Sequence, residues 1–588
     1  MSTSDKDKHG DEKQWYDFPD LIAGPKLFQN RNELREKNLL DTEEPPLEKS
    51  SEPPPADARN ARTSDGTYND LSSPRMGCAG MRFGRNVPLS ETFPDTANMM
   101  NPSPRRVSLE LLTRTEFQEA TFLNVIAAAW IQFMVHDWFV HKKGAWSFTH
   151  DIPLDAGDTW HERPMRVPKT PADPPKVAGS TRPPAYINEN THWWDGSAIY
   201  GSSPSTQASL RAGREGKVLV SPSGRLGVDP VTGKEITGFT ENGWVGLSLL
   251  HALFALEHNA VCDALKKHNP LWDDERLFQQ ARLVNAALLA KIHTVEWSTS
   301  ILPNEVVSTG LRANWFGLFE KLPTIFPGLE DRDILRGIPG SPTDHHGTPF
   351  SLTEEFVSVY RMHPLMPDHF TFCSADTGGE LDRMELPELS GRRGVDVLGR
   401  FNPADLFYSL GIAHPGAVRL HNYPKSLQNL VQDNGERFDL GTVDILRDRE
   451  RGVPRYNQFR RLLHMPAVRS FDEISDVPAW CEEIRRVYDN DLEKVDTMVG
   501  MMCEALPKGF GFSDTAFRVF LLMASRRLKS DRFLSKDFRA EVYTKQGMDW
   551  VNQTTMIDVI SRHFPSLAEP MKGLKSAFNP WTSKGGKT

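Results

Sequence analysis

The sequence predicts a mainly α-helical fold, with one large helical domain, a small β-hairpin and a poorly ordered N-terminal arm. Apolar residues recur with a helical period through most of the chain after residue 65, whereas the alternation typical of strands is almost absent. No repeat of roughly 20–50 residues is visible, so a solenoid is excluded. The length of 588 residues alone suggests about four domains. No linker is obvious after residue 65, so we expect an arm over 1–65 and one domain over 66–588.

The expected arm is rich in charged residues and proline. The stretches DKDKHGDEK and TEEPPLEKSSEPPPADARN have the composition of segments that bury too little apolar surface to fold. Residues 15–40 carry scattered apolar side chains and could dock on the domain. We favour this docking over a role at a membrane edge, which stays open as an alternative.

The expected elements then follow in chain order. A proline-rich stretch at 164–184 is typical of a surface loop, and KVLVSPSGRLGVDPVTGKEITG, at 217–238, is typical of one small hairpin. The helical periods predict helices at 115–142, 245–268, 273–300, 351–363, 481–505, 513–530 and 554–563.

Composition narrows the class of partner and compartment. The 69 Lys and Arg residues against 78 Asp and Glu residues give a net charge of −9 without a basic stripe, which argues against nucleic acid. The five cysteines are scattered and suggest neither a disulfide framework nor a zinc site. Met1 to Lys13 lacks a secretory h-region, and the apolar run 122–135 is too short to span a bilayer. We therefore expect a cytoplasmic protein that is not secreted and is at most peripheral to membranes.

The first motif is IQFMVHDWFVH, residues 131–141. Gln132 and His136 are four residues apart and share one helix face. The spacing of His136 and His141 is five, which rejects the zinc-protease pattern. Taken alone, a histidine on an apolar helix is more often a core residue than a ligand.

The second motif is THWWDGSAIYGS, residues 191–202. Oxygen-bearing side chains recur at Thr191, Asp195 and Ser197, and the carbonyl of Trp193 could join them. With Asp137, this set would suit a hard cation such as Ca²⁺ (calcium). A turn-rich loop with incidental polar residues is an equal alternative.

The third motif is TEEFVSVYRMHPLMPD, residues 353–368. Tyr360 and His363 are three residues apart, so on a helix their side chains stand side by side. If His363 ligates an iron, the phenol of Tyr360 lies near the same cofactor. The pair is common by chance, and its specificity comes from the other motifs.

Together, FMVHDWFVH, NTHWWDGSAIYGS, HALFALEHNAVCDAL and EFVSVYRMHPLMPD resemble the animal-type haem peroxidase superfamily. Within it the chain looks most like the fatty-acid α-dioxygenases, from about residue 62 to residue 581. The resemblance implies a haem-peroxidase-like helical domain. We expect a monomer, and peripheral contact with a membrane or lipid stays open as an alternative.

The resemblance also assigns roles to residues. It implies that His136 is the distal haem histidine, with Gln132 beside it, that His363 is the proximal iron ligand and that Tyr360 forms a radical. It implies that Ca²⁺ is bound by Asp137, Thr191, the Trp193 carbonyl, Asp195 and Ser197. Asp444 takes the place of an asparagine behind the proximal histidine and could hydrogen-bond His363. An ordinary helix-end charge is as good a reading of Asp444.

Departures from the mammalian peroxidases bear on the cofactor. Val135 replaces the acid that esterifies haem, and Thr240, Gly243 and Trp244 stand where an Arg-x-x-Glu-Met run would be. We therefore expect non-covalent haem b (heme b). The missing arginine removes a cation that helps to split peroxides, so efficient peroxidase turnover is not expected.

A carboxylate clamp completes the expected site. On the helix 513–530, Arg527 flanks the apolar face whereas Arg526 lies opposite it, and an arginine fork matches a carboxylate. The resemblance points to the same Arg527, and it adds His293 and Ser298, where plant members carry threonine. A solvated surface arginine and an ordinary helix histidine remain the alternatives.

The implied reaction is α-dioxygenation. Peroxide acts as activator, a radical on Tyr360 abstracts hydrogen from C2 of a fatty acid, and O₂ adds to give the 2-hydroperoxy acid. That product can lose CO₂ to give an aldehyde one carbon shorter. The rivals are a peroxidase that oxidises small reductants, a mid-chain fatty-acid dioxygenase, and a haem-bearing scaffold without activity.

Overall fold

The computed structural model describes residues 13–174, 177, 179–221, 223–318 and 333–584. The described residues are mainly helical. The α-helices are α1 Asp20–Lys37, α2 Pro104–Val107, α3 Val125–Trp138, α4 Ser197–Tyr200, α5 Pro204–Leu210, α6 Val245–His268, α7 Asp274–Ile292, α8 Ser298–Ile301, α9 Glu305–Phe316, α10 Asp333–Arg336, α11 Glu354–Val359, α12 Gly391–Arg400, α13 Pro403–Ile412, α14 Lys425–Gln428, α15 Leu440–Glu450, α16 Tyr456–Leu462, α17 Pro478–Val487, α18 Thr497–Cys503, α19 Asp514–Ser530, α20 Ala540–Gln553 and α21 Met556–His563.

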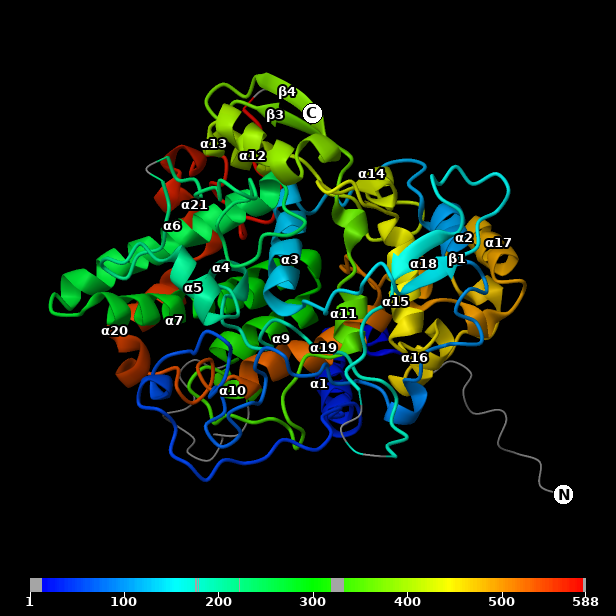
Figure 1. Cartoon of the computed structure of the whole chain (residues 1–588), viewed down its shortest axis with the longest axis horizontal. Helices are drawn as coiled ribbons and strands as arrows, with labels where there is room; N and C mark the ends of the chain where they lie inside the picture. Colours follow the sequence, from blue (N-terminus) through cyan, green and yellow to red (C-terminus); the bar gives the residue numbers. More distant parts are fainter. Residues whose placement is uncertain (1–12, 175–176, 178, 222, 319–332, 585–588) are drawn as a thin grey trace.

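Helices α3, α6 and α7 form the centre of the larger half of the fold (Figure 1). Helix α6 is apolar on nearly every face and packs against both α3 and α7, so its side chains are buried all round. Among the described residues it is the one helix that could cross a membrane by length and composition, but 83% of its most apolar stretch is buried. A helix in the core of a folded domain has the same length and apolar composition.

Helix α3 is fixed at its first turn by the end of the chain. The side chain of Asn124 caps the helix by accepting from the N–H of Ala127 at 3.3 Å. Its amide also donates to the carbonyls of Ala577 and Asn579, at 2.7 and 2.8 Å. The ring of Phe578 packs on Trp130 of the same helix, with 5.3 Å between ring centres.

Strands are confined to three short antiparallel pairs, β1 Thr149–Ile152 with β2 Met165–Pro168, β3 His369–Cys373 with β4 Glu380–Glu385, and β5 Leu430–Val431 with β6 Arg437–Phe438. Among the described residues no named strand lies at 217–238, and the predicted hairpin is present there only as a short antiparallel bridge between Val228 and Glu235. The N–H of Ile236 donates to the carbonyl of Gly227 at 2.7 Å, and that of Asp229 to the carbonyl of Lys234 at 2.8 Å. Side chains of this stretch also bond to helices: Thr237 donates to the carbonyl of Ala198 in α4, and Glu235 accepts from Ser248 in α6.

Part of the arm is packed against the domain, chiefly Trp15 and helix α1. Trp15 is 2% exposed, packs on Phe517 of α19 with 5.8 Å between ring centres, and donates to Asp514 at 3.3 Å. Helix α1 lies against α9 and α19 and buries Leu27 and Leu34. The docking considered for 15–40 is therefore present. The first 12 residues lie outside the described chain, and a domain boundary at residue 65 stays a prediction.

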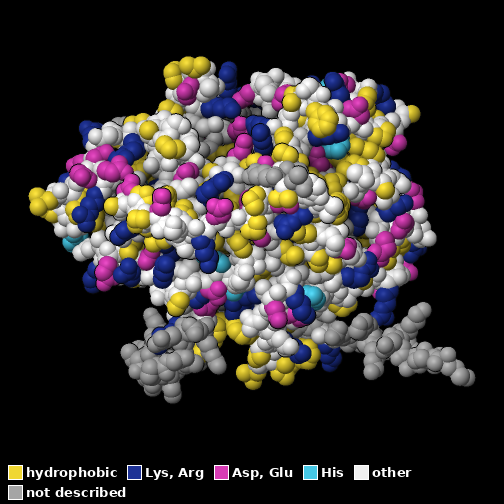
Figure 2. Space-filling model, turned by 60° about the horizontal axis from the view of Figure 1, so that its bottom comes forward, with side chains coloured by type: hydrophobic (Ala, Val, Ile, Leu, Met, Phe, Trp, Pro, Cys, Tyr) yellow, Lys and Arg dark blue, Asp and Glu magenta, His cyan; other side chains and the backbone are white. Residues whose placement is uncertain are grey.

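The surface carries charges of both signs. Figure 2 shows Lys and Arg side chains interspersed with Asp and Glu over the face in view, without one continuous stripe of either sign. The even mixture agrees with the small net charge of −9 on 588 residues.

Candidate active site

His136 lies in the last turn of α3. Its side chain is buried, and Nδ1 has no hydrogen-bond partner among the described residues. Burial lowers the pKa of His136 to about 3, so the ring is neutral at ordinary pH. Gln132, one turn earlier, accepts a hydrogen bond from the indole of Trp244 at 2.9 Å. The two residues thus lie on one helix face, as the spacing predicted.

Tyr360 and His363 lie where α11 gives way to a short 3₁₀ turn, His363–Leu365. Pro364, the second residue of that turn, has no N–H to donate and so opposes continuation of α11. Tyr360 is 6% exposed, and burial raises its pKa above the ordinary value, so the phenol keeps its proton. Its ring packs edge-on against Trp138 and Phe356, with ring centres 5.3 and 4.7 Å away.

Asp444 on α15 lies directly behind His363. Its Oδ2 is 2.9 Å from Nδ1 of the imidazole, off the ideal hydrogen-bonding line, and accepts from the phenol of Tyr423 at 3.0 Å. Burial acts to raise the pKa of Asp444, but His363 and Arg361 outweigh it and hold that pKa below its ordinary value. A negative charge therefore faces one nitrogen of His363 and leaves Nε2 for a metal. This favours the paired role over the helix-end alternative.

Arg527 is enclosed by aromatic rings. Its guanidinium carbon lies 4.0 Å from the ring centre of Trp138, 4.0 Å from that of Trp194, and 5.5 Å from that of Phe356. The side chain is 1% exposed, and Nε and Nη2 have no hydrogen-bond partner among the described residues. Burial lowers its pKa to about 9, so it remains a cation at neutral pH. The surface-arginine alternative is excluded.

His293 and Ser298 are brought together by a π-helical turn, His293–Trp297, between α7 and α8. The N–H of Ser298 donates to the carbonyl of His293, which is the i to i+5 bond of a π-helix. Residues five apart are therefore closer to one face of the turn than they are in an α-helix. The carboxylate of Glu296 fixes this turn by accepting from the N–H of Met556, at 3.2 and 3.1 Å.

Both side chains of this pair are oriented for a ligand. Nδ1 of His293 accepts from the indole of Trp130 at 3.2 Å, so the ring proton of the neutral form is on Nε2. Burial and the charge of Arg527 lower the pKa of His293 well below its ordinary value. The hydroxyl of Ser298 is buried and has no partner among the described residues. Unused donors on His293, Ser298 and Arg527 are what a bound carboxylate would need.

The loop at 191–197 folds back on the end of α3. Oδ1 of Asp137 accepts from the N–H of Ala198 at 2.9 Å, while the hydroxyls of Thr191 and Ser197 each donate to Asp195 at 2.7 Å. Burial and the nearby Asp195 raise the pKa of Asp137. Across the part of the chain that the structure describes, no group of three or more His, Cys, Asp or Glu is arranged around a metal position.

The donors of this loop nevertheless suit calcium. The carboxylate of Asp137 at the end of α3 and that of Asp195 in the loop are each 1% exposed, and the loop adds two hydroxyls and the backbone carbonyl of Trp193. One cation already lies near: Nη2 of Arg282 is 3.6 Å from Oδ2 of Asp195. The residues fit calcium in ligand type.

Sequence reasoning missed the residues that connect the site. Trp138 touches Arg527, Tyr360 and His293, whose ring centre is 5.0 Å away. Trp194 lies 5.2 Å from Trp138 and faces the same guanidinium. Both belong to quoted motifs, so the signal was present as an aromatic side chain next to each predicted ligand.

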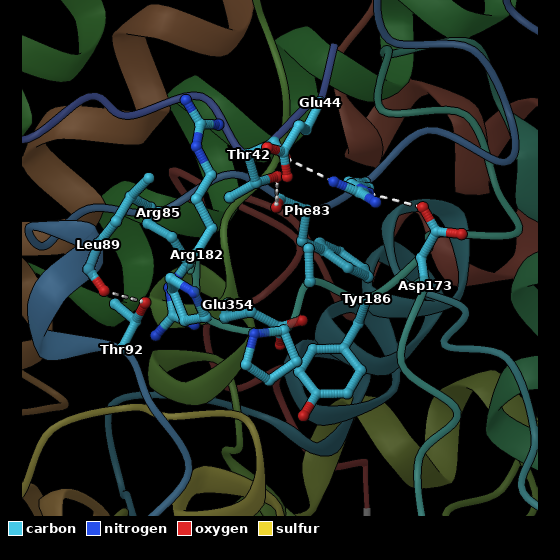
Figure 3. A pocket seen from close by; sticks show the side chains of 14 residues that line it. Thr42, Glu44, Phe83, Arg85, Leu89, Thr92, Asp173, Arg182, Tyr186 and Glu354 are labelled. Atoms are coloured by element: carbon cyan, nitrogen blue, oxygen red, sulfur yellow. Dashed lines mark hydrogen bonds and ion pairs between the residues drawn. The ribbon is translucent and has the colours of Figure 1, made fainter. Parts of the chain in front are cut away.

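A pocket lined largely by polar side chains lies outside this cluster (Figure 3). Two of its arginines already have acidic partners: Arg82 lies 2.6 Å from Asp173, and Arg85 lies 2.7 Å from Glu355. Glu354, at the first turn of α11, also lines it. None of the residues predicted for catalysis lines this cavity, so we place the active site around Tyr360 and Arg527 instead.

Comparison with known proteins gives the class of this site. Residues 61–573 match the family model described as animal haem peroxidase. The chain belongs to that haem peroxidase family, and within it to the α-dioxygenases. Two features of the structure fit haem: Nε2 of His363 is left for iron by the Asp444 contact, and the buried Nδ1 of His136 has no protein partner.

The particular relatives are plant enzymes. Alpha-dioxygenase 2 of Arabidopsis thaliana is 38% identical over 97% of this chain and 91% of its own length. A crystal structure of the fatty acid α-dioxygenase of the same plant superposes with a TM-score of 0.91, at 36% identity over 98% and 91% of the two chains. A Tyr-to-Phe variant of the rice fatty acid α-dioxygenase, crystallised with palmitic acid, gives 0.88 at 37% identity over 96% and 94%.

Proposed function

We propose that the protein is a haem-dependent fatty-acid α-dioxygenase. The observation that carries this proposal is the contact of Trp138 with both Arg527 and Tyr360, which joins an unpaired buried cation to a buried phenol. A fatty acid held by its carboxylate at Arg527 would have C2 as its next carbon. The palmitic acid complex of the rice relative supports the substrate class.

Each residue has a definite task in this reaction. The donors of Arg527, His293 and Ser298 hold the carboxylate, and the two indoles orient the guanidinium without using its N–H groups. Haem b, held by His363 without a covalent bond to the protein, would supply the oxidising power. His136, which is neutral and lies beside Gln132, would face the peroxide and take up its proton.

Tyr360 performs the bond-breaking step. It gives up an electron and its phenolic proton, and the resulting oxygen radical takes one hydrogen atom from C2 of the held fatty acid. O₂ adds to the carbon radical, and the peroxyl radical recovers a hydrogen atom from Tyr360, so the 2-hydroperoxy acid leaves and the tyrosyl radical is restored. Holding the reacting atoms at roughly 3–3.5 Å removes the entropic cost of encounter.

Palmitate incubation tests the proposal. Haem-loaded protein in oxygenated buffer should take up O₂ and form 2-hydroperoxy or 2-hydroxy palmitate and the C15 aldehyde, detected by mass spectrometry. The Tyr360→Phe variant should bind haem with an unchanged Soret band and form none of these products. Peroxide-dependent oxidation of small reductants that persists in this variant, with no fatty-acid product from the parent protein, would leave a peroxidase as the better reading. Oxygenation at a mid-chain carbon would favour the second rival.

We propose further that Asp137, Thr191, the Trp193 carbonyl, Asp195 and Ser197 bind Ca²⁺. The support is the chemistry of the oxygens and the mutual repulsion of the two buried carboxylates, which a divalent cation would relieve.

Calcium removal should therefore lower stability. A chelator should lower the melting temperature, added Ca²⁺ should restore it, and Asp137→Asn should remove the difference, with metal content read by mass spectrometry. Protein that is purified without calcium and does not respond to it would contradict this site, and Arg282 would then be the counter-ion of Asp195.

The protein is proposed to work as a cytoplasmic monomer that meets its substrate at lipid surfaces. The support for lipid contact is the exposure of apolar side chains on α1, where Leu21 is 92% exposed and Ile22 47%. Binding to fatty-acid-loaded vesicles, lost in Leu21→Asp, would test this contact. Equal sedimentation of both proteins with the vesicles would contradict it.

A further inference from the structure

The cation of Arg527 lies over the faces of two indoles. Its carbon is 4.0 Å from each ring centre, and the rings of Trp138 and Trp194 meet edge-on at 85°, so the guanidinium lies between them. The three side chains are at most 4% exposed. In such a setting a charge is screened far less than in water. Both indoles therefore experience a full positive charge.

Trp138 is also the indole in contact with the proposed radical residue. Its ring centre is 5.3 Å from that of Tyr360, which is van der Waals contact. Further aromatic rings continue from it, through Trp194 and His293 to Trp297, with ring centres 5.2, 5.5 and 4.9 Å apart in turn. Distance alone would therefore let an electron vacancy pass from Tyr360 into the protein.

Two features oppose that transfer. A tryptophan that loses an electron becomes a cation, and at Trp138 it would form 4.0 Å from the cation of Arg527. The alternative is to lose the indole proton, but the Nε1 atoms of Trp138 and Trp194 are buried and have no acceptor among the described residues. Both oxidised forms of tryptophan are therefore disfavoured here.

We propose that Arg527, besides holding the carboxylate, confines the radical to Tyr360. This inference rests on the proposed function. In the transfer that it opposes, one electron passes from Trp138 to the Tyr360 oxygen radical and one proton returns to that oxygen from solvent, which restores the phenol and leaves an indole radical cation. The energetic cost of this electron transfer is greatest before substrate binds, since a bound carboxylate compensates the charge of Arg527. The radical therefore stays on Tyr360 until a fatty acid binds.

Isotope-edited paramagnetic resonance tests the proposal. Haem-loaded full-length protein, made with ring-deuterated tyrosine or ring-deuterated tryptophan, is mixed with hydrogen peroxide without fatty acid and freeze-quenched. In the unmodified protein, deuterated tyrosine should narrow the signal and deuterated tryptophan should not. In Arg527→Leu the ratio of tryptophanyl to tyrosyl radical should rise roughly tenfold or more, and adding Trp138→Phe should remove the tryptophanyl part.

Arg526→Leu is the matched control. Arg526 is the neighbouring arginine and is equally buried, but it donates to the carbonyls of Thr348 and Pro349 and lies over Phe350, outside the cage. The radical signal of the Arg526→Leu variant should remain tyrosyl. The Soret band of each variant reports whether the haem site has formed.

A second measurement needs no mutation. 2,2-Difluoropalmitate has a carboxylate but no hydrogen at C2, so it should compensate Arg527 without consuming the radical and should raise the tryptophanyl share in the unmodified protein. A purely tyrosyl signal both in Arg527→Leu and with this acid would overturn the inference, as would a tryptophanyl signal in unmodified protein alone. Failure of the proposed function gives a different result, namely no O₂ uptake with palmitate.

Discussion

Asp444 puts a full negative charge behind His363, where an asparagine would put only a dipole. The carboxylate is held in place by Tyr423 and by the charge of Arg361, whose Nε lies 3.7 Å from Oδ1. A carboxylate behind a metal-bound imidazole increases the basicity of the ring and fixes its orientation. The same environment keeps Asp444 ionised, since its pKa is below the ordinary value.

Replacing that charge should therefore change the reduction potential of the haem iron. In Asp444→Asn the reduction potential of the bound haem should rise, and activity should fall roughly 10–100-fold, as for other residues that orient a metal ligand. Spectroelectrochemical titration measures the potential. Tyr423→Phe is the control, because it removes one hydrogen bond to Asp444 and keeps the charge. An unchanged potential in Asp444→Asn would mean that His363 does not sense the carboxylate.

At the scale of the element, the π-turn at His293–Trp297 decides the clamp. Spacing of five residues would put His293 and Ser298 on different faces of a regular α-helix, and the extra residue in the turn aligns them. No periodicity in the sequence predicts this, because a π-turn is set by packing. Here it is fixed by Glu296, which bonds to the first N–H of α21 some 260 residues later in the chain.

Ser298→Ala should weaken substrate binding through this element. Losing one hydrogen bond to a carboxylate costs about 1.5–3 kcal/mol, so KM for palmitate should rise roughly 10–150-fold while haem binding is unchanged. Ser298→Thr keeps the hydroxyl, so its KM for palmitate should equal that of the parent protein. The matched control is Thr299→Ala, whose hydroxyl already bonds to the carbonyl of Val295 at 2.9 Å. Equal KM values in Ser298→Ala and the parent protein would exclude this hydroxyl from the clamp.

The helices show what sequence can predict. The strongly apolar α6 matches its predicted range, 245–268, and α19 begins within one residue of the predicted start. The predicted helix at 481–505 is two, α17 and α18, because the chain turns at Asp489 and Asn490, which both have positive φ. Helices such as α15 were missed since polar side chains that are paired inside the fold leave no apolar stripe.

At the scale of the whole molecule, both ends of the described chain brace the catalytic helices. The N-terminal Trp15 packs on α19, which carries Arg527, and the C-terminal Phe578 packs on α3, which carries His136. The site itself unites residues 136, 293, 360 and 527. Long-range packing of this kind is invisible in the local sequence, although the motifs predicted which residues take part.

The contact of Trp15 with α19 can be removed without changing a residue of the active site. Trp15→Ala removes a buried indole, a loss of about 3–5 kcal/mol in a well-packed site, so the segment up to Lys37 should detach more often. Limited proteolysis should then cleave it faster while the Soret band is retained. Leu21→Ala is the control, because Leu21 is 92% exposed. Unchanged cleavage in Trp15→Ala would show that α1 is held mainly by its other contacts.

The bonds from Asn124 to Ala577 and Asn579 have a consequence for biosynthesis. A ribosome makes the first turn of α3 long before it makes the residues that fasten that turn. The growing polypeptide therefore gains this fastening only after 453 further residues have been added to Asn124. Until then the helix that carries His136 is held by its other contacts alone, so its start is a part of the fold that is completed late.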